Sequence, residues 1–134
     1  MGYTNHGISH VRKVSQSAYN IVVELGLSQR DAELAAISGL LHDIGNVVHR
    51  NGHAQTSGIL SLDILRRLGM PLVEAVTVAG AVGNHDEGDG GPVSVPSAAL
   101  IIADKCDVIR SRVRNRNMIH WDIHDRVNYA VERS

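Results

Sequence analysis

The chain has 134 residues and a mass of 14.5 kDa, which fits a single domain over residues 1–134. Thirteen Lys and Arg against fourteen Asp and Glu give a net charge of -1, which argues against a nucleic-acid partner. The single cysteine, Cys106, excludes an intramolecular disulfide framework, and no apolar stretch approaches the roughly 20 residues that cross a bilayer. We therefore expect a cytoplasmic protein with no membrane partner, and the composition leaves a homo-oligomer open.

Helical periodicity dominates the first half of the chain. Over residues 8–25, apolar side chains recur at steps of three and four, and Gly26 is expected to end this helix. A second helix is predicted from the N-cap Ser28 to a stop at Gly45. His42 stands on a stripe of small residues, which predicts a close neighbouring helix. These small residues are Ala35, Ser38 and Gly39.

Three further helices are predicted in the second half. One lies near 55–68, another begins at Pro71, and Pro96 can open the next. The stripe of this last helix that is expected to face the core consists of Ala99, Ile102, Cys106, Ile109 and Val113. A final helix is predicted over 122–133. Few aromatic and many small aliphatic residues then favour an all-α bundle of about five to six helices.

Residues that could bind a transition metal occur on every predicted helix or at its end. Taken singly, each histidine is more often a structural or surface residue than a ligand. A combination of imidazoles and carboxylates suits Mn, Fe, Co, Ni or Zn, whereas Ca prefers oxygen ligands. The candidate ligands are His10, His42, Asp43, His53, His85 and Asp104.

Five motifs, in the same order, resemble the HD superfamily of metal-dependent phosphohydrolases. The signature of that superfamily is a His, a His-Asp pair and a distant Asp. The first, second and last motifs match His10-Val11-Arg12-Lys13-Val14, Leu41-His42-Asp43-Ile44-Gly45 and Ala103-Asp104-Lys105-Cys106-Asp107. The subset that binds two metals has two extra histidine motifs, similar to His53 with Gly58-Ile59-Leu60, and to Asn84-His85-Asp86-Glu87. The resemblance spans residues 5–107.

The resemblance implies two divalent transition-metal ions. His10, His42, Asp43 and Asp104 would hold one ion, while His53 and His85 would hold a second, with Asp43 bridging the two. Such a site hydrolyses a phosphate ester through a metal-bridged hydroxide, here of a nucleotide or small phosphorylated metabolite. The same ligand set also resembles the mixed-valent diiron oxygenases of the superfamily, such as myo-inositol oxygenase, which act on small organic substrates.

Other polar residues are candidates for substrate binding and proton transfer. His6 precedes His10 by one helical turn and can reach the substrate. Lys105 can offer charge to a phosphoryl group, and Asp86 can protonate a leaving oxygen. Arg110 and Arg114 share the predicted helix of Asp104 and can steer an anionic ligand. Each of these side chains has a solvent-exposed surface role as its alternative.

Overall fold

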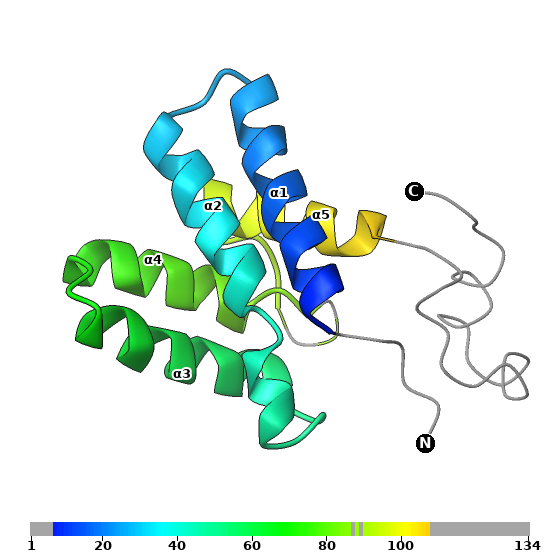
Figure 1. Cartoon of the computed structure of the whole chain (residues 1–134), viewed down its shortest axis with the longest axis vertical. Helices are drawn as coiled ribbons and strands as arrows, with labels where there is room; N and C mark the ends of the chain where they lie inside the picture. Colours follow the sequence, from blue (N-terminus) through cyan, green and yellow to red (C-terminus); the bar gives the residue numbers. More distant parts are fainter. Residues whose placement is uncertain (1–6, 87, 89, 108–134) are drawn as a thin grey trace, which may run out of the picture.

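The protein is all-α, as the sequence predicts. A computed structural model describes residues 7–86, 88 and 90–107, and this part contains five α-helices and one short 3₁₀ helix (Figure 1). The elements are α1 (Ile8–Glu24), α2 (Gln29–Leu41), η1 (Ile44–Val47), α3 (His53–Arg67), α4 (Leu72–Gly83) and α5 (Val95–Cys106). The helix predicted over 122–133 lies outside the described residues.

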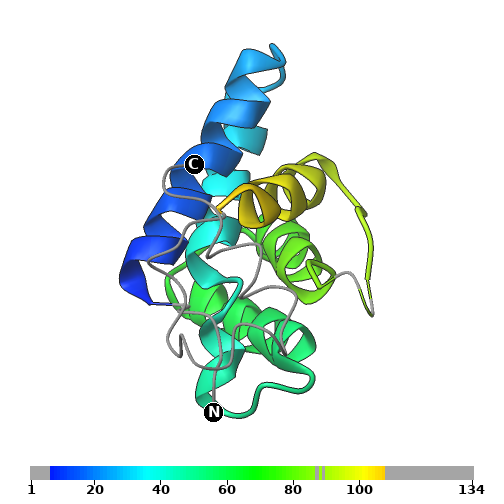
Figure 2. The same ribbon diagram turned by 90° about the vertical axis from the view of Figure 1, so that its right-hand side faces the viewer.

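Two helical hairpins form the body of the fold. α1 pairs with α2 and α3 pairs with α4, while α5 packs against α1, α2 and α4 (Figures 1 and 2). α2 is central, because it contacts α1, α4 and α5. The hairpin turns follow Gly26 and Gly69, whose positive φ values of 68° and 85° match the predicted helix ends. Ser28 caps α2 as expected, its hydroxyl accepting from the backbone N–H of Asp31.

Small residues let α1 and α2 approach closely. The predicted stripe beneath His42 is buried: Ala35, Ser38 and Gly39 are all inaccessible. At Gly39, an added Cβ would lie 2.6 Å from Cα of Ser15 in α1, which is far inside van der Waals contact. The close approach brings the start of α1, with His10, to the end of α2, with His42.

The end of α2 differs from the prediction. The helix stops at Leu41, four residues before Gly45, and His42 is its C-cap. Gly45 lies instead in η1, where a Cβ would be 2.7 Å from the backbone nitrogen of Ser57 in α3. Its backbone N–H donates to the Ser57 hydroxyl at 2.7 Å. Glycine is therefore required here for the contact between η1 and α3, and not to end the helix.

The predicted core face of α5 is wrong in two places. Ile102 is half exposed and Cys106 is exposed, whereas Leu100 and Ala103 are buried. The periodicity placed Leu100 and Asp107 on a different side from the predicted core stripe, but both are buried. The buried face of α5 is therefore rotated toward the side of Asp104 and Asp107, because a polar site lies next to these two residues.

Within the described ranges 7–86, 88 and 90–107, no helix is both long and apolar enough to cross a membrane.

Candidate metal centre

Six imidazole and carboxylate side chains from separate parts of the chain meet at one end of the bundle. They are His10 in α1, His42 and Asp43 after α2, His53 at the start of α3, His85 after α4 and Asp104 in α5. We call this set the His–Asp cluster. Five of its members are buried and Asp104 is partly exposed. Every candidate ligand predicted from the sequence is thus in the same place.

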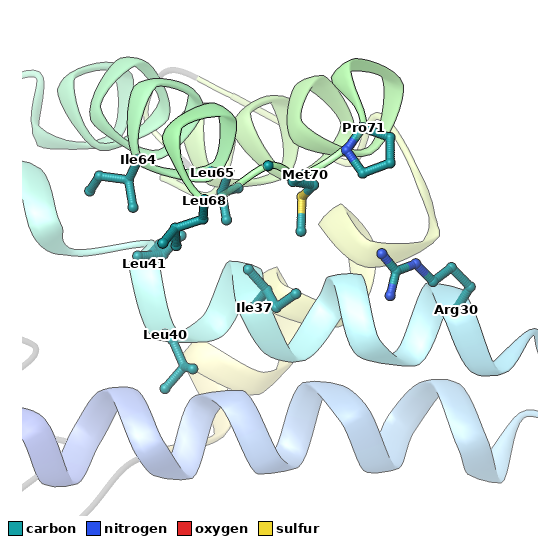
Figure 3. A pocket seen from close by; sticks show the side chains of 10 residues that line it. Arg30, Ile37, Leu40, Leu41, Ile64, Leu65, Leu68, Met70 and Pro71 are labelled. Carbon is teal, nitrogen blue, oxygen red and sulfur yellow. The ribbon is translucent and has the colours of Figure 1, made fainter.

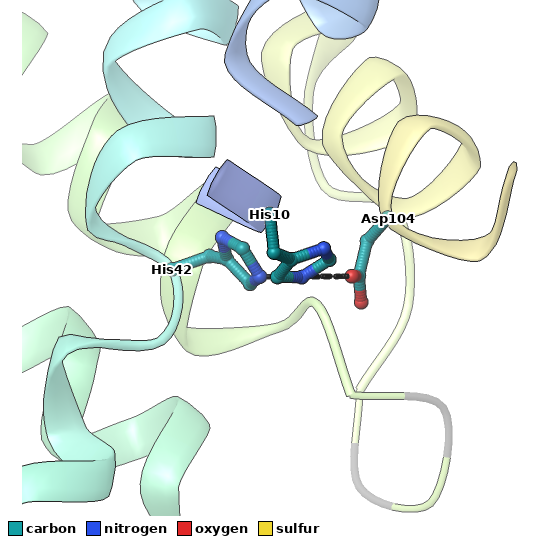
Figure 4. Close-up of side chains that lie close together, drawn as sticks. All are labelled: His10, His42 and Asp104. Atoms are coloured by element: carbon teal, nitrogen blue, oxygen red, sulfur yellow. Dashed lines mark ion pairs between the residues drawn. The ribbon is translucent and has the colours of Figure 1, made fainter. Parts of the chain in front are cut away.

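One half of the cluster joins α1, α2 and α5. Nε2 of His10 lies 3.0 Å from Oδ1 of Asp104, and Nε2 of His42 lies 3.6 Å from the same oxygen (Figure 4). One ligand-type atom from each of these three residues falls within 4.8 Å of the other two. Such an arrangement can hold one metal ion with nitrogen and oxygen ligands.

Asp43 connects the two halves of the cluster. Its Oδ2 lies 3.3 Å from Nε2 of His42, and its Oδ1 lies 3.5 Å from Nε2 of His53. His85 packs edge-on against both His42 and His53, with ring centroids 5.0 and 5.1 Å apart. His42, Asp43 and His85 form a second group whose ligand-type atoms lie within 4.8 Å of one another. The two carboxylate oxygens of Asp43 therefore face different histidines.

The four histidines are all anchored through Nδ1. Nδ1 of His42, His53 and His85 lies 2.9, 3.1 and 2.6 Å from a backbone carbonyl oxygen three residues earlier in the chain. These oxygens belong to Gly39, Arg50 and Val82. An Nδ1–H donated to a carbonyl leaves the lone pair of Nε2 directed into the cluster. This is the usual orientation of metal-binding histidines in proteins.

His10 is anchored by a carboxylate. Its Nδ1 lies 2.7 Å from Oδ2 of Asp107, which is buried, and Nζ of Lys13 lies 3.4 Å from Oδ1 of the same residue. Asp107 therefore orients His10 from the Nδ1 side of its ring. The sequence patterns predict no role for Asp107, which is the C-cap of α5 and lies three residues after Asp104.

Nε2 of His42 gives an independent test of metal binding. It is completely buried and has no hydrogen-bond partner within the described part of the chain. A buried polar atom without a partner costs about 1–3 kcal/mol. A metal ion at this position would use the lone pair, so the residues present fit a metal.

The electrostatics separate the cluster into charged and neutral members. Burial disfavours the charged form of Asp104, but the imidazole of His10 at 3.0 Å and that of His42 at 3.6 Å outweigh this effect and lower the pKa of Asp104 well below its usual range. Burial also opposes protonation of His42, yet the carboxylates of Asp104 and Asp43, which lie 3.6 and 3.3 Å from its Nε2, raise its pKa to about 10. Without a metal, His42 therefore carries a proton that a metal ion must displace.

The two remaining histidines have the opposite shift. Burial, together with the positive charge of Arg50, lowers the pKa of His53. Burial and the charge of His42 lower the pKa of His85. Both imidazoles are therefore neutral at pH 7 and available as ligands.

The predicted substrate-binding and proton-transfer residues are less closely grouped. Asp86 is at the rim of the cluster, with its carboxylate 3.8 Å from Nδ1 of His53 and nearly half exposed. Lys105 is exposed on α5, directly after Asp104. His6, Arg110 and Arg114 lie outside the described residues.

An apolar groove lies elsewhere on the surface, between α2 and the α3–α4 hairpin (Figure 3). It has a volume of about 440 Å³ and is lined by Arg30, Ile37, Leu40, Leu41, Ile64, Leu65, Leu68, Gly69, Met70 and Pro71. No member of the His–Asp cluster lines it. The groove and the cluster are therefore distinct features.

The fold and the cluster together define a class: all-α domains that gather histidines and aspartates from several helices into a site suited to metal ions. Residues 7–110 match the HD domain family, and the chain belongs to this family. The resemblance seen in the sequence is thereby confirmed.

Two relatives and one solved structure are similar to this chain. An uncharacterised protein of Methanocaldococcus jannaschii is 26% identical over 155 residues, covering 99% of this chain and 60% of the relative. Ribonuclease Y of Aquifex aeolicus is 34% identical over 102 residues, covering 75% of this chain and 16% of the enzyme. A predicted HD superfamily hydrolase from an uncultured Thermotogales bacterium has a TM-score of 0.66 and 26% identity over 78% of this chain and 57% of its own. All three relatives are longer than the matched region.

Proposed function

We propose that the protein is a metal-dependent phosphohydrolase that cleaves a phosphate ester of a nucleotide or a small phosphorylated metabolite. The observation that carries this proposal is the His–Asp cluster, in which ligand-type atoms converge around the buried Nε2 of His42, an atom that forms no hydrogen bond with any described residue. The cluster would hold two divalent transition-metal ions, drawn from Fe, Mn, Co, Ni and Zn.

The ligands divide between the two ions around Asp43. His10, His42 and Asp104 would hold one ion, His53 and His85 would hold the other, and Asp43 would contribute one carboxylate oxygen to each. The support for this division is that Oδ2 of Asp43 faces His42 while Oδ1 faces His53. When bound, a divalent metal supplies two kinds of chemistry: it lowers the pKa of coordinated water from about 15.7 to about 7, and it neutralises charge on phosphoryl oxygens.

Side chains of this chain supply the remaining functions. Asp43 would hold both metals, because its two carboxylate oxygens face different histidines. Asp86 lies at the rim of the His–Asp cluster and would donate a proton to the leaving oxygen. The negative charge of the phosphoryl group would be neutralised by Lys105, Arg110 and Arg114. His6 would contact the substrate. No serine or cysteine nucleophile is needed, because water is the attacking group.

One relative supports the choice of phosphate esters. Ribonuclease Y of Aquifex aeolicus is named for cleaving RNA, whose backbone is a chain of phosphodiesters, and its similarity to this chain includes 102 residues. A phosphate ester is therefore favoured over other hydrolysable substrates.

A phosphate-release screen tests the proposal. The protein is freed of metal, supplied separately with Mn, Fe, Co, Ni or Zn, and offered nucleotides, sugar phosphates, p-nitrophenyl phosphate and bis-p-nitrophenyl phosphate. We expect hydrolysis with at least one metal, loss of turnover in Asp43→Ala, and about one metal fewer per chain in His85→Ala. His49→Ala is the control, because His49 is exposed and outside the cluster.

Two further variants connect the activity to phosphate charge. Lys105→Ala and Arg110→Ala should reduce phosphate-ester hydrolysis, with KM raised if the cation binds substrate and transition state equally. If the protein instead consumes O₂ with an organic substrate, shows a mixed-valent diiron spectrum and releases no phosphate, it is an oxygenase of the same superfamily and the proposal is wrong.

A further inference from the structure

Arg50 brings a positive charge to the edge of the His–Asp cluster. It lies in the connection between η1 and α3, and its side chain turns back toward the end of α2. Its Nη1 is 3.3 Å from Oδ1 of Asn46 and 4.0 Å from Oδ1 of Asp43. The side chain is 41% exposed, whereas the Asp43 side chain is only 5% exposed. The guanidinium therefore stands between the buried carboxylate and solvent.

The backbone of the same residue is fixed to the cluster. The carbonyl oxygen of Arg50 accepts hydrogen bonds from Nδ1 of His53 at 3.1 Å and from the His53 backbone N–H at 3.2 Å. One residue thus orients a candidate metal ligand with its main chain and presents a cation beside that ligand with its side chain. These hydrogen bonds fix the Arg50 main chain, so the side chain extends from a defined position next to the cluster.

Asn46 holds the guanidinium in place without neutralising it. The amide nitrogen of Asn46 donates to Oδ1 of Asp43 at 2.8 Å, while its amide oxygen accepts from Nη1 of Arg50. Asn46 therefore occupies the position of closest contact to Oδ1 and leaves Arg50 at a longer distance from the carboxylate. A neutral side chain is the main hydrogen-bond partner of Arg50.

The described residues use little of the hydrogen-bonding capacity of Arg50. A guanidinium has five N–H donors, and among the described residues only Nη1 of Arg50 has a contact. Arg30 provides a contrast, since its Nε and Nη2 form a two-pronged pair with the carboxylate of Glu74 and its Nη1 binds Glu33. All three nitrogens of the Arg30 guanidinium bind protein carboxylates, whereas Arg50 has exposed donors next to a site suited to metals.

We propose that Arg50 binds a non-bridging oxygen of the substrate phosphoryl group at the mouth of the His–Asp cluster, with Asn46 as its positioning residue. A planar guanidinium matches two oxygens of a tetrahedral phosphate in a bidentate way. The inference rests on the proposed function, because it names the residue that recognises the anionic part of that substrate. It is a role for a side chain that the sequence motifs did not single out.

The test uses inorganic phosphate, so that it does not depend on turnover. Phosphate binding to the Mn-loaded protein is measured by calorimetry for the wild type, Arg50→Gln and Arg50→Lys, together with the number of metals per chain. We expect unchanged metal content, at least tenfold weaker phosphate binding in Arg50→Gln, and partial recovery in Arg50→Lys. Arg67→Gln is the matched control, because Arg67 is an exposed arginine of α3 paired with Asp63.

The outcomes separate this inference from the proposed function. If Arg50→Gln binds phosphate as tightly as the wild type while the protein hydrolyses esters, the inference is overturned and the function stands. If no ester is hydrolysed but phosphate binding still requires Arg50, the inference stands alone. Loss of metal in Arg50→Gln would assign Arg50 to the metal site and overturn its role in anion binding. For any ester that is hydrolysed, KM should rise in Arg50→Gln more than kcat falls.

Discussion

Asp107 is the residue through which α5 influences His10. It is buried, binds Nδ1 of His10 and is itself contacted by Lys13. A carboxylate in this position fixes the imidazole orientation and increases its basicity as a ligand. We predict that Asp107→Ala weakens metal affinity about 10–100-fold, the range typical for residues that support a ligand. A competition titration with a chromophoric chelator measures this.

The control for Asp107 is an aspartate with a surface role. Asp63 is exposed, and among the described residues it pairs only with Arg67 one helical turn away, so Asp63→Ala should leave metal affinity unchanged. Asp107→Asn should lie between the wild type and alanine, because the amide oxygen can still accept from His10 but carries no charge. Equal affinities in Asp107→Ala and the wild type would contradict the positioning role.

His42 makes metal binding dependent on pH. In the metal-free protein its pKa is raised to about 10, against an ordinary value of 6.5. At pH 7.5 the metal must therefore displace a proton, and affinity should increase as the pH rises from about 6.5 toward 10. Calorimetry in two buffers of different ionisation enthalpy should show proton release. Binding heats that are the same in both buffers would contradict the prediction.

The same shift affects the stability of the metal-free protein with the opposite sign. Because the folded-state pKa of His42 lies above its unfolded value, its contribution is complete below pH 6.5 and is lost as the pH rises to about 10. Asp104 has a lowered pKa, so its contribution is present above about pH 4 and is lost in acid. Urea unfolding of the metal-free chain should therefore show a lower free energy of unfolding at pH 9.5 than at pH 6.

At the level of elements, the contact between α1 and α2 positions two of the histidines. We predict that Gly39→Ala destabilises the protein by about 1–3 kcal/mol, because the new Cβ would meet the backbone of Ser15, which cannot rotate away. Separation of the helices should also move His10 away from His42 and weaken metal binding. Chemical denaturation and the chelator titration measure the two effects.

Gly80 in α4 offers the matched substitution. A Cβ there would meet only Cγ2 of Val93 at 3.9 Å, an ordinary contact. Gly80→Ala should therefore be neutral or stabilise by up to about 1 kcal/mol through helix propensity. If both variants had the same stability, close packing at Gly39 would not be the reason for its glycine.

Over the whole molecule, the His–Asp cluster joins every helix of the described part to one site. A metal bound there would connect α1, the end of α2, the start of α3, the loop after α4, and α5. Binding to the folded state alone stabilises by about 2.7 kcal/mol at a metal concentration of 100 times Kd. We predict that Mn or Zn raises the melting temperature and that EDTA reverses the effect.

Variants establish where this stabilisation originates. Asp43→Ala should abolish the metal-dependent rise in melting temperature, since Asp43 lies between the two halves of the cluster. His49→Ala should retain it, because His49 is exposed and outside the cluster. A rise that persists in Asp43→Ala would place the metal elsewhere on the protein.

The sequence by itself determined the helical class, the order of the elements and the members of the His–Asp cluster. Turn glycines, N-caps and three- to four-residue periodicity are local signals, so they need no knowledge of distant contacts. The small stripe beneath His42 also indicated the close approach of a neighbouring helix, although only the structure shows that this helix is α1. The six candidate ligands were recognisable because motif order in the HD superfamily links positions that local patterns cannot connect.

Only the tertiary structure decided which neighbours each of these residues has. The buried face of α5 was mispredicted because it was read from the spacing of apolar residues alone, whereas the buried Asp107 binds His10, 97 positions away in the chain. Arg50 was not singled out, since nothing local shows that its side chain turns back to Asp43 while its carbonyl binds His53. A charged group is buried in a protein only where a partner compensates its charge. Partners that are distant in sequence come together only when the helices pack.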